Sequence, residues 1–172
     1  MNESAFNLLA GSRASEAAVY LLTNVPGLPP ISQAVHILGI AVVMGSVVMV
    51  DLRLLGLAVP SQNVSEMIGR LMPWMWCALA SNLVTGLLFV FARPGRYFFN
   101  PVFGIKFALL VPAVVLAVIV HRLGTREPGY WEASRGRAIS ARVIAVVSLA
   151  MWVGVVLAGR WIAYWDYLFF YE

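Results

Sequence analysis

The sequence predicts an all-α membrane protein, an up-down-up-down bundle of four transmembrane helices preceded by a short interfacial helix. Two observations on composition support this fold. Hydrophobic residues make up 61% of the chain, while charged residues make up 12%, about half the share found in soluble domains. Four long apolar segments are joined by short polar ones, and the mean hydropathy is +0.84. This composition excludes an ordinary soluble enzyme, a disordered chain and a nucleic-acid-binding protein.

The first 30 residues form the most polar part of the predicted fold. Residues Ser15–Asn24 (SEAAVYLLTN) match a short amphipathic helix, which opens with a Ser-Glu capping signal and ends before Pro26-Gly27. We expect this helix to lie on the outer membrane interface. The segment lacks the basic start, apolar core and small-residue cleavage site of a signal peptide. We therefore expect residues 1–30 to remain as an outer-face segment before the transmembrane domain at 31–172.

Four apolar runs have the length that a membrane helix requires, since a bilayer core of roughly 30 Å takes about 20 residues. The predicted spans cover about residues 31–58, 68–92, 101–122 and 141–166. Their continuous apolar character differs from the short alternating segments of a β-barrel. Because the connections are short, consecutive spans are expected to pack antiparallel. An aromatic belt is predicted at the outer end of the fourth span, formed by Trp161, Tyr164, Trp165, Tyr167 and Tyr171.

The distribution of basic residues predicts the orientation of the bundle. One end carries seven arginines: Arg53, Arg70, Arg122, Arg126, Arg135, Arg137 and Arg142. The other end carries five basic residues: Arg13, Arg93, Arg96, Lys106 and Arg160. Positive charge favours the cytoplasmic side. We therefore expect a multi-pass protein of a bacterial inner membrane with both termini in the periplasm.

His36 is the first candidate for chemistry, because an ionisable group inside a span is costly and indicates function. It lies about one turn inside the predicted outer boundary, on one helical face with Gln33 and Gly39. A neutral imidazole can bind haem iron or copper, carry protons, or hydrogen-bond to a neighbouring helix. The interhelical hydrogen bond is the structural alternative to a ligand role.

Lys106 and Arg160 are predicted at the same depth as His36, since the starts of the first and third spans and the end of the fourth share one leaflet. Two fixed cations beside an imidazole would repel a bare metal ion and attract an anion. The three side chains would therefore suit a haem propionate, a quinone headgroup or a lipid phosphate. The alternative is that Lys106 and Arg160 extend to lipid headgroups.

A second polar cluster is predicted at the inner end, formed by Asp51, Arg53, Arg70, His121 and Arg122. We expect Asp51 to pair with an arginine from another helix, because burying either charge alone is costly. A proton or ligand gate is the functional alternative. His121 lies roughly 20 Å from the level of His36 by helix rise. The two histidines therefore cannot bind the same iron within one monomer.

Other polar residues indicate packing rather than catalysis. Ser81, Asn82 and Thr85 lie near the middle of the second span, where hydrogen bonds between helices are expected. The chain lacks CxxC, HExxH, a glycine-rich phosphate loop and a nucleophile elbow. Two histidines and one cysteine cannot complete a zinc site without carboxylates. No enzymatic activity is predicted from these motifs.

Three segments carry a resemblance to a known family: QAVHILGIAVVMGSVVMVDLRLLGLAV, FNPVFGIKFALL and LAGRWIAY. From about residue 30 to 166 the chain resembles a family of small bacterial membrane proteins of unknown function. This resemblance implies four helices in the inner membrane. A looser similarity connects the segment HILGIAVVMG, with Gly104 and Lys106, to the copper-resistance D membrane proteins. This match is partial, because the present chain has fewer helices and lacks a methionine-rich outer loop. The positions that either resemblance carries over are His36, Asp51, Arg53, Lys106, His121 and Arg160.

Three hypotheses about function follow. The leading one is an outer-leaflet pocket that binds an anionic cofactor through His36, Lys106 and Arg160, with haem b as the first candidate and a quinone as the second. The second hypothesis is copper handling or transport with His36 as the metal ligand. The third is a non-catalytic accessory subunit or assembly factor of a membrane complex. The lipid bilayer is the expected partner in each case, with a homo-oligomer or larger complex as a further expectation.

Overall fold

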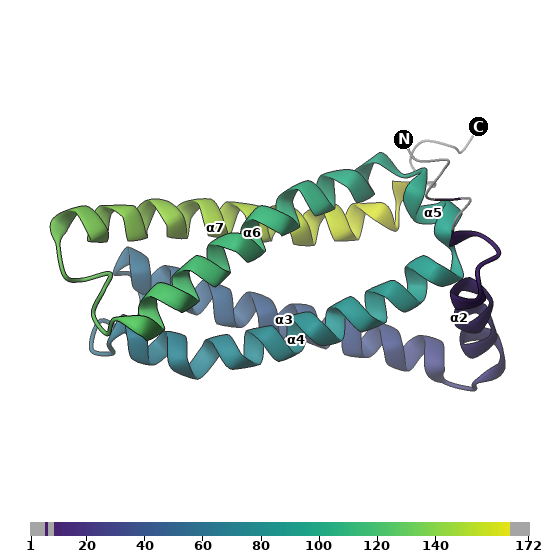
Figure 1. Cartoon of the computed structure of the whole chain (residues 1–172), viewed down its shortest axis with the longest axis horizontal. Helices are drawn as coiled ribbons and strands as arrows, with labels where there is room; N and C mark the ends of the chain where they lie inside the picture. Colours follow the sequence, from purple (N-terminus) through teal and green to yellow (C-terminus); the bar gives the residue numbers. More distant parts are fainter. Residues whose placement is uncertain (1–5, 7–8, 166–172) are drawn as a thin grey trace.

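The computed structural model describes Phe6 and residues 9–165 and shows the predicted all-α bundle (Figure 1). Four long helices form it: α3 (Leu28–Leu55), α4 (Val64–Ala92), α6 (Pro101–Arg126) and α7 (Arg135–Ile162). Each of the four is long and apolar enough to cross a membrane. These helices confirm the predicted fold class and indicate an integral membrane protein.

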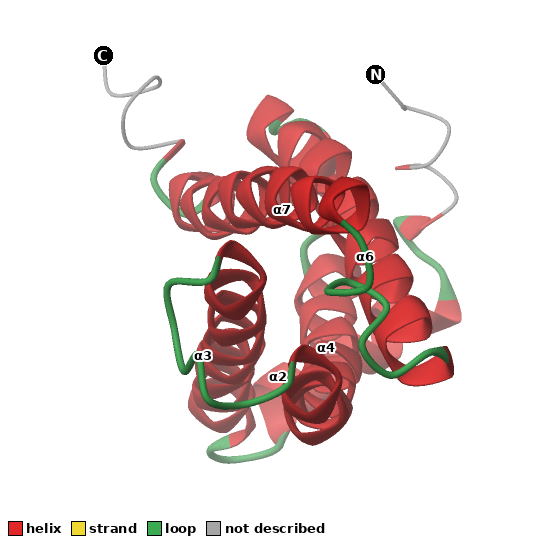
Figure 2. Ribbon diagram, turned by 90° about the vertical axis from the view of Figure 1, so that its left-hand side faces the viewer, coloured by secondary structure: helices red, strands yellow, loops and turns green. Residues whose placement is uncertain are grey.

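The four long helices pack in a ring, in the order α3, α4, α6, α7, with α7 returning to contact α3 (Figure 2). Chain order thus equals spatial order, as short connections require. Both connections at one end, 56–63 and 127–134, belong to the arginine-rich end of the bundle. The opposite end carries the two short helices, so we call it the α2–α5 end.

The long helices begin where the sequence provides starting signals. Pro29 and Pro30 occupy the first turn of α3, where the missing N–H groups cost nothing. Ser134 begins α7 by accepting a hydrogen bond from the Arg137 amide, so this helix starts at Arg135. Asn100 caps α6 through its bond from the Val102 amide at 3.0 Å. The Asn100 side chain also donates to the Ile162 carbonyl at 3.3 Å, which joins α6 to α7.

Two short helices lie at the α2–α5 end. The predicted amphipathic helix is α2, Arg13–Asn24, which begins earlier than expected because Ser12 rather than Ser15 is its cap. It packs on α4 and α3. The second short helix, α5 (Pro94–Phe98), was not predicted, since five residues are too few to show a helical pattern. Of the predicted aromatic belt, Tyr167 and Tyr171 lie outside the described residues.

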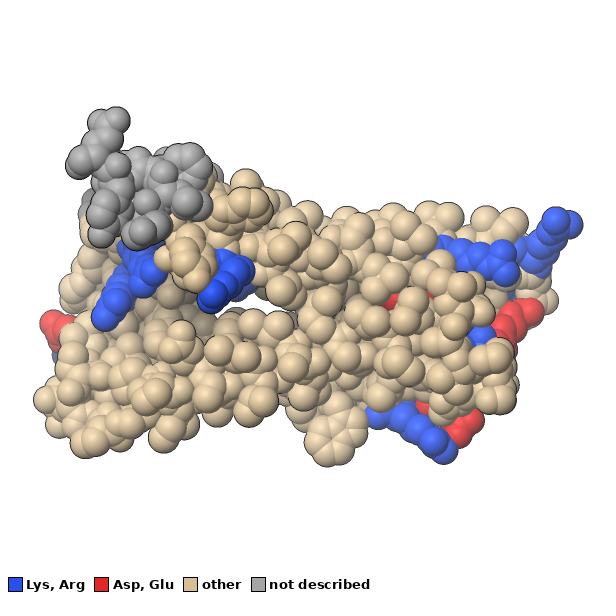
Figure 3. Space-filling view, turned by 180° about the vertical axis from the view of Figure 1, so that it is seen from behind, with Lys and Arg blue, Asp and Glu red and all other residues tan. Residues whose placement is uncertain are grey.

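The hydrophobic core lies in the arginine-rich half of the bundle. Its buried members fall within 43–54, 64–75, 113–131 and 141–152, with Ile68 and Met75 fully enclosed. Trp131, from the connection between α6 and α7, is 3% exposed and closes this half. Toward the α2–α5 end the two hairpins, α3–α4 and α6–α7, are separated by a hollow with Lys and Arg side chains beside it (Figure 3). The bundle is therefore closed at one end and open at the other.

Gly39 allows α3 and α4 to approach closely. A Cβ at this position would collide with the Asn82 amide of α4, while a Cβ at Gly45 on the same helix would meet nothing within 4 Å. We predict that Gly39→Ala lowers the free energy of unfolding by about 1–3 kcal/mol, because Asn82 must move out of its hydrogen-bonded position.

The matched variant Gly45→Ala is expected to leave stability unchanged or to raise it slightly, since alanine favours helix more than glycine does. Thermal or denaturant unfolding in detergent, followed by circular dichroism, measures both variants. Equal effects of the two substitutions would contradict the assigned α3–α4 contact.

Candidate functional site

His36 lies half-buried on α3 and faces α4. Its Nδ1 is 2.7 Å from the Thr85 hydroxyl oxygen, and a Cβ on Gly86 would lie 3.4 Å from its Cε1. Gly86 therefore leaves room for the imidazole against the backbone of α4. The predicted interhelical hydrogen bond of His36 is present, with Thr85 as the partner.

The Thr85 hydroxyl determines which nitrogen of His36 carries the proton. Thr85 donates its only hydroxyl proton to the Ser81 carbonyl at 2.8 Å. We infer that its oxygen accepts at the His36 contact and that Nδ1–H is the donor there. The neutral ring thereby keeps the lone pair on Nε2. A histidine held in this way by a second residue is suited to bind a metal or accept a proton through Nε2.

Asn82 fixes the backbone on which His36 stands. The Asn82 amide takes the orientation in which both of its groups form hydrogen bonds to α3. Its Nδ2 donates to the His36 carbonyl at 3.0 Å, and its Oδ1 accepts from the Ile40 amide at 3.1 Å. The same amide lies against Gly39, which is buried. The prediction that Ser81, Asn82 and Thr85 serve hydrogen bonding at helix contacts is confirmed for Asn82 and Thr85. Gly39 is thus a packing residue, and Gln33 is exposed.

Lys106 reaches the same region from α6. Its ammonium lies within electrostatic range of the His36 ring. The Cε and Nζ atoms lie 3.9 and 4.0 Å from the position that a Cβ on Gly159 of α7 would take. Within 9–165, Lys106 makes neither an ion pair nor a hydrogen bond. A half-buried cation is therefore left without a counter-ion.

Arg160 does not join this pair in the structure. It is exposed, and it donates from Nη2 to the Tyr164 hydroxyl at 2.6 Å. Its guanidinium carbon also lies 4.8 Å from the centre of the Tyr164 ring. Of the three basic side chains predicted to gather, His36 and Lys106 lie within electrostatic range of each other, while Arg160 bonds to Tyr164 instead. The aromatic residue one turn later directs Arg160 along the surface of α7.

At the other end of the bundle, the predicted pairing of Asp51 with an arginine is wrong. Asp51 is 3% exposed, and its carboxyl group hydrogen-bonds to the buried hydroxyl of Ser148 on α7. Its Oδ2 has no partner among the described residues. The candidate arginines bind elsewhere: Arg53 to Glu132 at 2.9 Å and Arg70 to Glu66 at 2.6 Å. Both acidic partners lie near the polar connections, where Glu132 and Glu66 are exposed.

His121 is separate from both sites. It accepts a hydrogen bond at Nδ1 from the Trp76 indole nitrogen at 2.7 Å, and the two rings stack with their centres 6.0 Å apart. His121 and Arg122 belong to the last turns of α6, at the arginine-rich end, and Arg122 is exposed. The structure therefore does not bring Asp51, Arg53, Arg70, His121 and Arg122 into one cluster. A groove of about 400 Å³ between α6 and α7, which the sequence did not predict, opens instead near Lys106.

Arg53 joins both connections at the arginine-rich end. Its Nε donates to the Gln62 carbonyl at 2.6 Å, and Nη2 bonds to Glu132 in the other connection. We predict that Arg53→Met lowers the free energy of unfolding by about 1–3 kcal/mol, because it leaves both acceptors without their donor. The midpoint of thermal unfolding in detergent measures the loss.

Arg70→Met is the matched control for this prediction. Arg70 forms an exposed i,i+4 pair with Glu66, which is expected to contribute no more than about 0.5 kcal/mol. A loss in Arg70→Met as large as that in Arg53→Met would show that Arg53 does not connect the two loops in the folded protein.

Comparison with known proteins identifies the family. No curated protein and no solved structure matches the chain. One family model, described as a family of unknown function (DUF6644), matches residues 25–165. This match covers α3 to α7, including His36, Thr85 and Lys106. The chain therefore belongs to the family of unknown function DUF6644.

Proposed function

We propose that this membrane protein binds a cofactor with anionic or electron-rich oxygen atoms between its helices, at His36 and Lys106. The supporting observation is the half-buried Lys106 ammonium, which packs against Gly159 of α7 within electrostatic range of His36 and has no counter-ion among the residues described. A buried charge is normally paired. An anionic or carbonyl oxygen of a ligand would provide the missing partner.

Haem b is the first candidate. His36 presents the Nε2 lone pair that an axial ligand requires, while Thr85 holds the opposite nitrogen, as the outer partners of metal-binding histidines do. Lys106 would pair with a haem propionate. Bound haem would supply electron-transfer chemistry at this depth of the bundle. His121 could not provide a second ligand, because it lies at the opposite end and is bonded to Trp76.

A quinone is the second candidate, and the same two side chains support it. Lys106 can donate a hydrogen bond to a carbonyl oxygen of the ring, with extra strength from its charge. His36 can accept the proton of a reduced quinone at Nε2. The headgroup would then lie at the hollow between the two hairpins (Figure 3).

Copper handling and an accessory role have weaker support. A bare copper ion at His36 would lie beside the Lys106 ammonium and be repelled by it. Within the described part of the chain, no group of three or more His, Cys, Asp and Glu residues is close enough to hold a metal ion. Among the described residues, no feature points to a protein partner for an accessory subunit.

Binding by purified variants tests the proposal. We expect the wild-type protein to bind haem b, seen as a Soret band, or a quinone, measured by equilibrium dialysis. His36→Ala and Lys106→Met should each weaken binding of that ligand by about tenfold or more, because each loses a contact that carries a charge or a metal bond.

Two matched controls accompany these variants. His121→Gln removes the histidine at the far end, and Arg160→Met removes the exposed cation that bonds to Tyr164. Both should bind within about twofold of wild type, as is usual away from a site. The proposal fails if the wild type binds neither ligand, or if His36→Ala and Lys106→Met bind as well as the controls. Stoichiometric copper that depends on His36 would support the copper alternative instead.

A further inference from the structure

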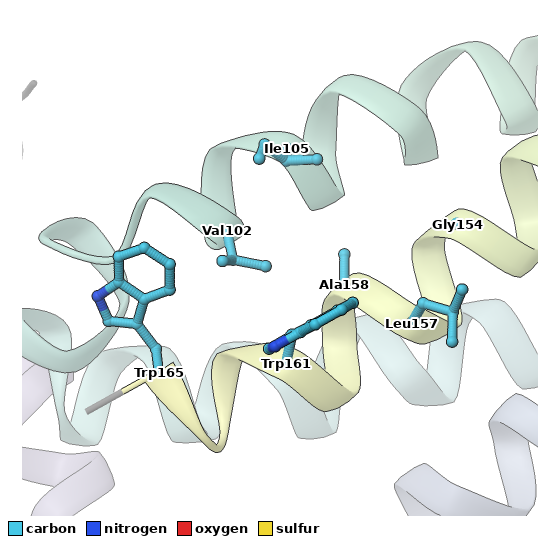
Figure 4. Close-up of a pocket in the computed structure, with 7 residues that line it drawn as sticks. All are labelled: Val102, Ile105, Gly154, Leu157, Ala158, Trp161 and Trp165. Atoms are coloured by element: carbon cyan, nitrogen blue, oxygen red, sulfur yellow. The ribbon is translucent and has the colours of Figure 1, made fainter. Parts of the chain in front are cut away.

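The groove between α6 and α7 has an almost entirely apolar lining (Figure 4). Val102 and Ile105 form its α6 wall, while Gly154, Leu157 and Ala158 form its α7 wall. Trp161 and Trp165 lie toward the C-terminal end of α7. The groove has a volume of about 400 Å³ and is open along its outer side.

This groove opens on the outside of the bundle. Ile105 is 55% exposed, and Leu157 and Trp161 are each 54% exposed. In a membrane, such a surface faces the hydrocarbon chains of the bilayer. An apolar chain can therefore enter the groove sideways from the bilayer without crossing a polar barrier.

Lys106 lies on the inner side of the same helix contact. It follows Ile105 in the sequence and lies one turn after Val102, both of which line the groove. Its ammonium rests against Gly159 of α7, the residue after the groove residue Ala158. The apolar groove and the cation thus occupy adjacent positions along one α6–α7 contact. His36 lies further inside, within electrostatic range of Lys106.

We propose that the groove holds the prenyl chain of a quinone whose headgroup lies at Lys106 and His36. This inference rests on the proposed cofactor site and selects a prenylated quinone over haem b. A prenylated quinone combines a ring with hydrogen-bonding oxygens and one long apolar chain. Haem has no such chain, so the groove would have no part in its binding.

The position of Lys106 also favours a quinone over a phospholipid. Lys106 lies about 8 Å along α6 from Pro101, by the rise of five residues. A lipid phosphate stays at the membrane surface, whereas a quinone ring can enter below it. A phospholipid also carries two chains, whereas a prenylated quinone carries one.

Equilibrium dialysis of the full chain in phosphatidylcholine nanodiscs tests the inference. The probes are a dimethoxy-benzoquinone with a short prenyl chain and the same ring with a methyl group in its place. With each affinity corrected for uptake by empty nanodiscs, we expect the prenylated probe to bind at least about tenfold more tightly, because its chain packs against the walls of the groove. Lys106→Met should weaken the binding of both probes.

Ile105→Trp is the variant that fills the groove, and Val111→Trp is its matched control on α6. Val111 is 59% exposed and does not line the groove. We expect Ile105→Trp to bring the ratio of the two affinities close to one, and Val111→Trp to preserve it. A preserved ratio in Ile105→Trp, or equal affinities in the wild type, would overturn the role of the groove.

The remaining outcomes separate this inference from the proposed site. If both probes bind equally but His36→Ala and Lys106→Met weaken them, the site stands and the groove role is wrong. If haem binds and neither quinone probe does, the site likewise stands and the groove role is wrong. If neither quinone nor haem binds, the proposed site fails as well. If added phosphatidylglycerol displaces the prenylated probe from the wild type but not from Ile105→Trp, the groove is a lipid site.

Discussion

The hydrogen bonds between α3 and α4 are the constraint on which the site depends. Polar groups inside a membrane must find their partners within the protein. Asn82 reaches the backbone of α3 beside Gly39, and Thr85 bonds to His36. These contacts fix the distance between the helices and the direction of the imidazole together. The histidine of the proposed site is thus held by groups that also stabilise the fold.

The uneven packing of the bundle leaves space at the proposed site. The core and the Arg53 contacts hold the arginine-rich half together. The other half contributes less buried apolar surface, and there the α3–α4 and α6–α7 hairpins stand apart (Figure 3). His36 comes from one hairpin and Lys106 from the other, so the site depends on how the hairpins dock. The closed half provides rigidity, and the open half provides access.

Hydropathy predicted the four long helices because their apolar runs are much longer than any soluble helix needs. The antiparallel order of the helices also predicted that His36 and Lys106 share one depth. The direction of a side chain at a helix end follows from local partners, so Arg160 turns to Tyr164. Asp51 was misassigned because its partner, Ser148, carries no charge and gives no signal in the sequence. The groove could not be predicted, since its lining combines residues of α6 and α7 that are about 50 positions apart in the sequence.

The central claim is that Thr85 holds His36 with its Nε2 lone pair directed to a site shared with Lys106. Nitrogen-15 NMR of histidine-labelled protein in nanodiscs tests it most directly, and His121 serves as an internal reference. The account predicts the Nδ1–H form for His36 and the opposite Nε2–H form for His121, whose Nδ1 accepts from Trp76. Lys106→Met should change the His36 signals and leave those of His121 in place. An Nε2–H form of His36, or His36 signals that do not respond to Lys106→Met, would contradict the account.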